Sequence, residues 1–218
     1  MTEKELENAI FSSSTKSAAG PDKIGFLILQ KAYLSISQLF YQLYNKLIKL
    51  GFHSDIWKDS IDVIIKKFNK KNYSDSKSYR VISLLNCLDK ISERIIAERL
   101  SYFAETTDLL HFDQIDNRKQ KSAIDAAISL LSDIEINKHD KKLTSVLFLD
   151  IKSAYDHLNK SQMIKICKNA KLSSACINWI HSFLTNRRVQ LAFDDEIMNK
   201  STNIHVRISQ SSSVSSIL

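Results

Sequence analysis

One stretch of this chain, Thr144–His157, concentrates residues that could carry chemistry. In it an apolar run, Val146–Leu149, ends abruptly on Asp150. Apolar runs of this length are typical of buried strands, and a carboxylate at the carboxyl end of such a strand lies where α/β proteins place their ligands. Asp150 is therefore a candidate metal ligand. The alternative is that Asp150 caps a helix beginning near Ser153, since aspartate is favoured at helix starts.

A second candidate site joins positive side chains to the start of a helix. Arg118, Lys119 and Lys121 come directly before Ser122-Ala-Ile-Asp125, a sequence typical of a capping box. Exposed backbone amides and neighbouring cations can act on the same anion, so this corner could bind a phosphate. The alternative is a charged loop without a ligand. In the helix itself, an inward face is predicted for Ile124, Ala127, Ile128 and Leu131.

The third candidate is a basic turn after a predicted strand. Residues Ile61–Lys67 are typical of a short strand, after which Lys67, Lys70 and Lys71 form a basic turn with Asn69 and Asn72. Such a turn suits a polyanion, although a solvated loop explains the same residues.

Helices and strands of ordinary length are predicted around these sites. Helical spacing of apolar residues predicts helices over 36–48, 88–103, 163–167 and 177–183. Gly51 stands where a left-handed cap residue would end the first of them. Residues 188–193 and 203–208 alternate like paired strands, with Asp194-Asp195 in the turn between them.

Composition indicates a globular protein that functions inside the cell. The 218 residues are 44% apolar, the net charge is +7, and the three cysteines are too far apart for a zinc site or a disulfide framework. We expect free thiols in a reducing compartment, nuclear or cytoplasmic. The amino terminus lacks an apolar signal core, and no apolar run approaches the roughly 20 residues of a membrane-spanning helix, so no membrane partner is expected.

Several motifs, in order, resemble the reverse transcriptase domain of non-LTR (LINE-type) retrotransposons, from about Ser17 to Leu218. Ser78-Tyr-Arg-Val-Ile-Ser-Leu-Leu85 matches the family's Ser-Tyr-Arg-Pro-Ile-Ser-Leu-Leu block at all positions but one. The other similar segments are Ala18–Asp22, Trp57–Lys67, Lys90–Arg94, Asp113–Ser122, Leu149–Asp156 and Ser209–Ser213.

The resemblance implies an α+β fold, helix-rich with a small antiparallel sheet, that forms the fingers and a partial palm of a polymerase-like right hand. The implied regions are an N-terminal extension (1–16), a fingers-like region (17–142) and a partial palm (143–218). The implied partners are an RNA template, a DNA primer and deoxynucleoside triphosphates.

The resemblance also implies chemistry by two Mg²⁺ ions held by carboxylates. Asp150 would be a catalytic metal ligand, whereas Asp156 would be structural. The residues expected to contact the incoming nucleotide are Arg80 and Arg118, then Lys121, the backbone of Ile151, the ring of Tyr155, and Gln210, which could also touch the template.

The chain departs from the family in ways that bear on activity. The family's second acidic motif, an aromatic residue, any residue and then Asp-Asp, should follow Gln210, and the sequence given ends at Leu218. Asp194-Asp195 precedes Gln210 and is read as a hairpin turn. Residues other than Gly and Pro stand where the family has those two, at Val81, Asp116, Gln120, Ser209, Ser211, Ser213 and Ser216.

We therefore predict a fragment of an RNA-directed DNA polymerase that is inactive by itself, because one carboxylate cannot hold two Mg²⁺ ions. The alternatives are a non-catalytic remnant that binds RNA or DNA, and a structural or interaction protein that reuses the helical part.

Overall fold

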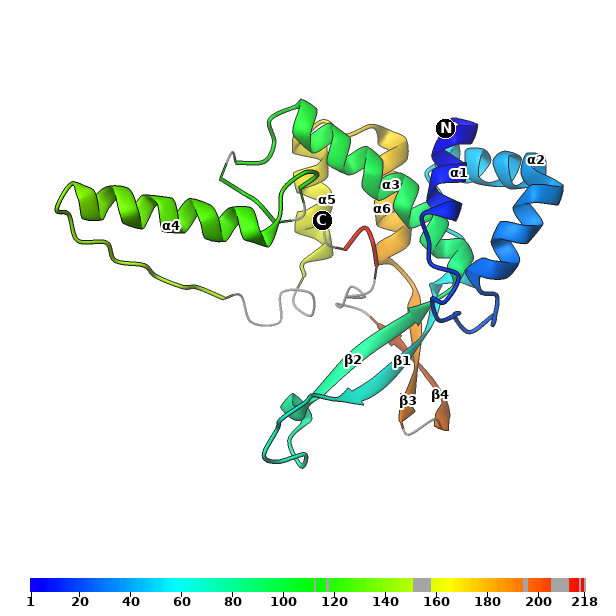
Figure 1. Cartoon of the computed structure of the whole chain (residues 1–218). Coiled ribbons are helices and arrows are strands. Elements are labelled where there is room, and N and C mark those ends of the chain that lie inside the picture. Colours follow the sequence, from blue (N-terminus) through cyan, green and yellow to red (C-terminus); the bar gives the residue numbers. More distant parts are fainter. Residues whose placement is uncertain are drawn as a thin grey trace.

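Helices form about half of the described residues, and a four-stranded sheet lies beneath them in Figure 1. The computed structural model describes residues 1–111, 113–116, 118–150, 158–193, 196–204, 212–215 and 217. The α-helices are α1 (Glu3–Phe11), α2 (Phe26–Leu50), α3 (Cys87–Thr106), α4 (Ala123–His139), α5 (Lys160–Asn169) and α6 (Ser174–Leu184). The strands are β1 (Asp59–Lys66), β2 (Tyr79–Leu85), β3 (Arg187–Phe193) and β4 (Glu196–Ile204). Short 3-10 helices, η1 (Asp55–Lys58) and η2 (Ser76–Ser78), precede β1 and β2. The predicted helix-rich α+β class is confirmed.

The core lies between α1, α2, α3, α5 and α6. Ile91 and Ile95 on α3 are buried at its centre, at the helical spacing that the sequence predicts. On α6, Trp179 and Phe183 stack with their ring centroids 5.2 Å apart. The Tyr44 hydroxyl of α2 donates a hydrogen bond to the carbonyl of residue 88 at 2.8 Å, which ties α2 to α3.

Gly51 ends α2, as predicted. Its φ is +62°, a left-handed conformation that glycine adopts without steric cost, and its amide donates to the Ile48 carbonyl at 3.2 Å. A Cβ atom here would lie 2.4 Å from the Ala175 carbonyl oxygen. The glycine therefore lets the end of α2 approach the start of α6.

The sheet is mixed, with strand order β2-β1-β3-β4. β1 pairs antiparallel with β2, and β3 with β4, but β1 pairs parallel with β3 from Asp59↔Arg188 to Val63↔Ala192. The expectation of a purely antiparallel sheet is therefore wrong. The chain between β1 and β3 includes α3 to α6, which supplies the long crossover that a parallel pair requires. β3 pairs with the strand that follows it, as predicted, but that strand is β4 rather than residues 203–208. Asp194-Asp195 and residues 205–208 lie outside the described residues.

Helix α4 forms where the sequence predicts it, but the prediction of its inward face is wrong. Ser122 and Asp125 make the predicted capping box. No residue of α4 is buried, however, and Ile124 remains 70% exposed. α4 extends away from the other helices (Figure 1). The spacing of apolar residues predicts which face of a helix favours burial, but it does not predict which element covers that face. Among the described residues no element covers the apolar face of α4.

The buried strand expected at Val146–Leu149 is absent. Residues 142–150 have no regular secondary structure, and Phe148 is 83% exposed. A strand forms only where a neighbour accepts and donates its backbone hydrogen bonds. The sheet among the described residues offers this segment no pairing.

The predicted division into three regions stays a prediction. α1, in the predicted extension, contributes the fully buried Leu6 and Ile10 to the common core. β1, in the predicted fingers, pairs with β3, in the predicted palm.

The structure also bears on the expectations of free cysteine thiols and of no membrane-spanning helix, within the described residues. Cys87, Cys167 and Cys176 are free thiols, as predicted, and burial raises the pKa of Cys176 to about 11. None of the helices described here is both long enough and apolar enough to span a membrane.

Candidate functional site

The β1–β2 hairpin presents a cluster of cations to solvent. β1 and β2 extend together away from the helices and are joined by residues 67–78 at the lower end of Figure 1. Exposed or half-buried cations on this hairpin are Lys66, Lys67, Lys70, Lys71, Lys77 and Arg80. The Phe68 side chain among them is 95% exposed. Cations next to an accessible aromatic ring suit a nucleic acid, because the cations bind phosphates and a base can stack on the ring.

Internal hydrogen bonds fix the shape of this basic loop. The Lys67 amide donates to the Ser78 carbonyl at 2.9 Å, and the Tyr73 hydroxyl donates to the Lys67 carbonyl at 2.9 Å. The Tyr79 hydroxyl donates to the Tyr73 carbonyl at 3.0 Å, and the two rings meet edge to face. A loop that is already ordered loses less conformational entropy when it binds, so its lysines are presented to a polyanion at low cost.

Arg80 lies on β2 opposite Ile65, and its side chain is exposed. Because strand residues alternate between faces, Arg80 and Ile82 point to the face opposite Ser83. Ser83 is buried, and its hydroxyl donates to Asp62 Oδ1 at 2.5 Å. Arg80 is thus accessible to a ligand.

Arg118 has a carboxylate partner within the chain. Its guanidinium donates to Glu105 on α3, with Nη2–Oε2 at 2.6 Å and Nε–Oε1 at 2.9 Å. The pairing raises the pKa of Arg118 and lowers the pKa of Glu105. A triphosphate bound by Arg118 would have to compete with this bidentate pair.

The start of α4 also has an anion of its own. The Ser122 hydroxyl accepts from the Asp125 amide at 3.2 Å, and Asp125 Oδ2 accepts from the Ser122 amide at 2.7 Å. The Ser122 hydroxyl donates to Asp125 Oδ2 at 2.8 Å, and this bond, together with the one from the Ser122 amide, lowers the pKa of Asp125. Lys121 is exposed beside this start. Of the predicted phosphate corner, Lys121 is accessible, whereas one helix amide already binds the Ser122 hydroxyl.

Asp150 is exposed at the end of the irregular segment 142–150. Among the residues described, no three His, Cys, Asp or Glu side chains come together as a metal site. Within this part of the chain, Asp150 therefore has no neighbouring carboxylates that would help it hold a pair of Mg²⁺ ions. Ile151, Tyr155, Asp156 and Gln210 lie outside the described residues.

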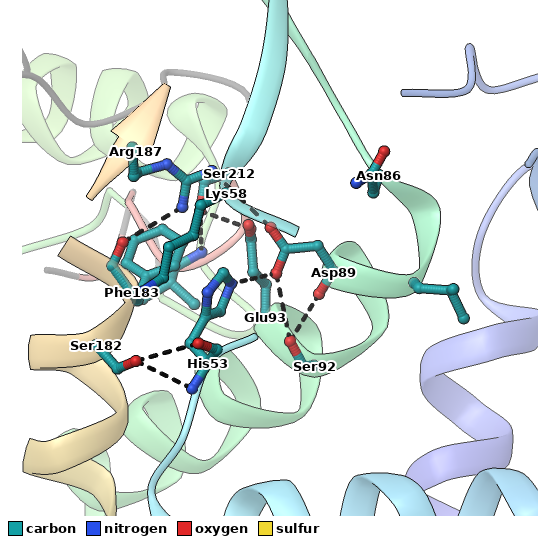
Figure 2. Close-up of polar contacts among 12 residues, drawn as sticks. His53, Lys58, Asn86, Asp89, Ser92, Glu93, Ser182, Phe183, Arg187 and Ser212 are labelled. Carbon is teal, nitrogen blue, oxygen red and sulfur yellow. Dashed lines mark hydrogen bonds and ion pairs between the residues drawn. The ribbon is translucent and has the colours of Figure 1, made fainter. Parts of the chain in front are cut away.

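A buried polar cluster lies where α3, α6 and the start of β3 meet (Figure 2). His53 Nε2 lies 2.6 Å from Asp89 Oδ1, and both side chains are 0% exposed. Arg187 Nη2 lies 3.9 Å from Asp89 Oδ2, and its guanidinium stacks over the Phe183 ring at 4.7 Å. Buried charges require such partners because water no longer solvates them. We define this cluster as His53, Asp89, Glu93, Arg187 and Ser212.

Glu93 connects the buried polar cluster to the C-terminal turn. Its Oε2 accepts from the Ser212 hydroxyl at 2.6 Å and from the Ser213 amide at 3.0 Å. Burial and the nearby Asp89 carboxylate raise the pKa of Glu93 to about 8, while Arg187 acts in the opposite direction. Glu93 is therefore mostly protonated at neutral pH.

Comparisons with known proteins show which family this chain belongs to. Residues 65–216 match the family described as reverse transcriptase (RNA-dependent DNA polymerase). The chain belongs to the reverse transcriptase family. It is 27% identical over 185 residues to the probable RNA-directed DNA polymerase from transposon BS of Drosophila melanogaster, covering 85% of this chain and 20% of that protein.

Two further relatives from Drosophila melanogaster agree. The probable RNA-directed DNA polymerase from transposon X-element is 28% identical over 88% of this chain and 21% of its own length. The RNA-directed DNA polymerase from mobile element jockey is 27% identical over 72% of this chain and 17% of its own length. The resemblance to non-LTR retrotransposon reverse transcriptases is confirmed, and this reverse transcriptase chain spans about a fifth of the relatives it matches.

Sequence reasoning missed the buried polar cluster of this reverse transcriptase chain. His53, Asp89 and Arg187 are far apart in sequence, so spacing gave no sign of their contact. Glu93 carried a signal, since the family resemblance includes Lys90–Arg94, but the residues alone assigned it no partner.

The raised pKa of Glu93 predicts that the chain becomes less stable as pH rises. Between the ordinary value of 4.5 and the folded value of about 8, the folded state binds a proton that the unfolded state has lost. Stability from this group is full below the lower value and falls by up to about 1.4 kcal/mol per pH unit until the higher value is passed. Urea denaturation at a series of pH values measures the slope.

The control for this prediction is Glu93→Gln, which cannot ionise and keeps an acceptor for Ser212. The variant is expected to show a smaller decline in stability between pH 5 and 8 than the wild type. Equal declines in both proteins would refute the assignment to Glu93.

Proposed function

We propose that this chain is the template-binding part of a retrotransposon RNA-directed DNA polymerase, and that it binds an RNA template annealed to a DNA primer. The observation that carries the proposal is the preordered basic loop between β1 and β2. Its lysines lie around the exposed Phe68, on a chain whose net charge is +7. Family membership supplies the class of nucleic acid.

The residues proposed to contact the nucleic acid differ in exposure and in whether a carboxylate of the chain already pairs with them. Arg80 and Lys121 are exposed and would bind phosphates of the template or the incoming deoxynucleotide. Arg118 would do so only after exchanging its Glu105 partner. For Asp150 as metal ligand, and for Ile151, Tyr155 and Gln210 at the nucleotide, the support is the family resemblance.

We further propose that residues 17–142 act as fingers and 143–218 as part of a palm. In this arrangement the hairpin holds the nucleic acid, and catalysis requires carboxylates besides Asp150. The 218-residue chain would then bind a template and primer without extending the primer. That behaviour is also what a non-catalytic nucleic-acid-binding remnant would show.

Binding to a fluorescently labelled RNA–DNA hybrid, measured by anisotropy at several salt concentrations, tests the proposal. We expect log affinity to fall linearly with log salt, because each lysine–phosphate contact releases a condensed counterion. Absence of binding at low salt would refute the proposed function and favour a structural or interaction role for the helical part.

A further inference from the structure

The C-terminal turn is held against α3 by one carboxyl group. Ser212 is 4% exposed, and its hydroxyl donates to Glu93 Oε2 at 2.6 Å. The Ser213 amide donates to the same oxygen at 3.0 Å, and the Val214 amide donates to the Ser212 hydroxyl at 3.2 Å. Val214 is fully buried in the core. Three consecutive residues are thus fixed by polar contacts that converge on Glu93.

The group that holds the turn is itself held firmly. Glu93 lies in the middle of α3, and its side chain is fully buried (Figure 2). Its neighbours in the buried polar cluster, Asp89 on α3 and Arg187 on β3, shift its pKa in opposite directions. A side chain confined by packing and by neighbouring polar groups can set the position of a backbone segment that bonds to it.

We propose that Glu93 is a positioning residue for the C-terminal turn Ser212–Val214, which follows the residue expected to contact the template. The proposal rests on the proposed function, in which Gln210, two residues before Ser212, touches the template or the incoming nucleotide. By bonding Ser212 and Ser213, Glu93 fixes the backbone that begins two residues after Gln210. Glu93 itself is buried and touches no substrate.

Packing of Val214 alone is the competing explanation for an ordered turn. It predicts that the turn keeps its order when the Glu93 acceptor is removed. The two explanations therefore differ in what Glu93→Ala does to the Ser213 and Val214 amides. Glu93→Gln is the matched control, because glutamine has nearly the same shape, keeps an acceptor oxygen and resembles the protonated carboxyl group.

The experiment measures amide hydrogen exchange by NMR on the 218-residue chain, free and bound to a short RNA template annealed to a DNA primer. In the free chain we expect the Ser213 and Val214 amides to exchange about tenfold faster in Glu93→Ala than in wild type. The Ser213 amide loses its own bond to Glu93, and the Ser212 hydroxyl, which accepts from the Val214 amide, loses the carboxyl group that holds it. Glu93→Gln is expected to exchange within about twofold of wild type. If Glu93→Ala does not fold, Ser212→Ala replaces it, and only the Val214 amide is then expected to exchange faster, because the Ser213 amide keeps its bond to Glu93.

Adding the hybrid gives the readout that a purely structural role would not change. We expect the hybrid to slow both amides further in wild type and Glu93→Gln, but not in Glu93→Ala, while anisotropy shows that all three bind it through the hairpin. Wild-type exchange rates in free Glu93→Ala would overturn the proposal. So would binding of the hybrid by wild type without an effect on these amides, although the proposed function would then stand. Failure of wild type to bind the hybrid would overturn the proposed function, and the positioning role with it.

Discussion

Replacing Asp89 with alanine is expected to lower the free energy of unfolding by about 3–5 kcal/mol, because it removes one partner of a buried ionic cluster. Asp89 is 0% exposed and lies 2.6 Å from His53 Nε2. Asp89 Oδ2 also lies 3.9 Å from Arg187 Nη2. Without Asp89 the buried His53 ring and the buried Arg187 guanidinium would each lose a polar partner.

The exposed pair Asp59–Arg188 provides the control. Asp59 Oδ1 lies 2.6 Å from Arg188 Nε, yet both side chains are well exposed, at 42% and 50%. Asp59→Ala is expected to cost less than about 1 kcal/mol, because water solvates whichever partner remains. Urea denaturation of both variants at pH 7 makes the comparison. Equal losses would show that burial of the cluster has no special role in stability.

Reversing three charges on the β1–β2 loop is expected to weaken hybrid binding about 100-fold or more at about 0.1 M salt. The variant carries Lys67→Glu, Lys70→Glu and Lys71→Glu. If each lysine contacts one phosphate, the slope of log affinity against log salt should fall by about three. Lys67→Glu removes the hydrogen bond from Lys67 Nζ to the Lys77 carbonyl at 3.0 Å, but the contact of Lys67 N with Ser78 O at 2.9 Å and that of the Tyr73 hydroxyl with Lys67 O remain to hold the loop.

The matched control makes the same change of charge on another face. Lys31, Lys46 and Lys49 are exposed on α2, and their replacement by glutamate alters the net charge equally. A specific interface predicts a much smaller loss of affinity for this control. If both triple variants lose affinity equally, binding reflects net charge rather than the hairpin.

Local signals predicted the elements that depend on neighbouring residues in the chain. Gly51 ended α2, and Ser122 with Asp125 capped α4, because both features need only a few consecutive residues. The apolar spacing of α3 likewise predicted its buried face, since α1, α2 and the other core helices cover it.

Features that depend on distant partners could not be predicted in this way. Phe148 belongs to an apolar run that reads as a strand, but no described strand pairs with it. The parallel pairing of Asp59 with Arg188 depends on how the whole chain between them folds.

In the candidate site, too, contacts between residues distant in sequence could not be predicted. Arg80 was identified by a motif and is accessible, whereas the pairing of Arg118 with Glu105 emerged only in three dimensions. His53, Asp89 and Arg187 meet because three separate elements pack together, and no spacing in the sequence encodes that contact.

Primer extension on an RNA template tests whether the chain binds a template and primer without extending the primer. The assay reports on template binding and on chemistry together. The reaction contains the 218-residue chain, Mg²⁺, deoxynucleoside triphosphates and a labelled DNA primer, at a salt concentration where anisotropy shows that the hybrid is bound. We expect a bound hybrid and a primer of unchanged length, in wild type and in Asp150→Ala alike. Template-dependent extension by wild type that Asp150→Ala abolishes would contradict this expectation.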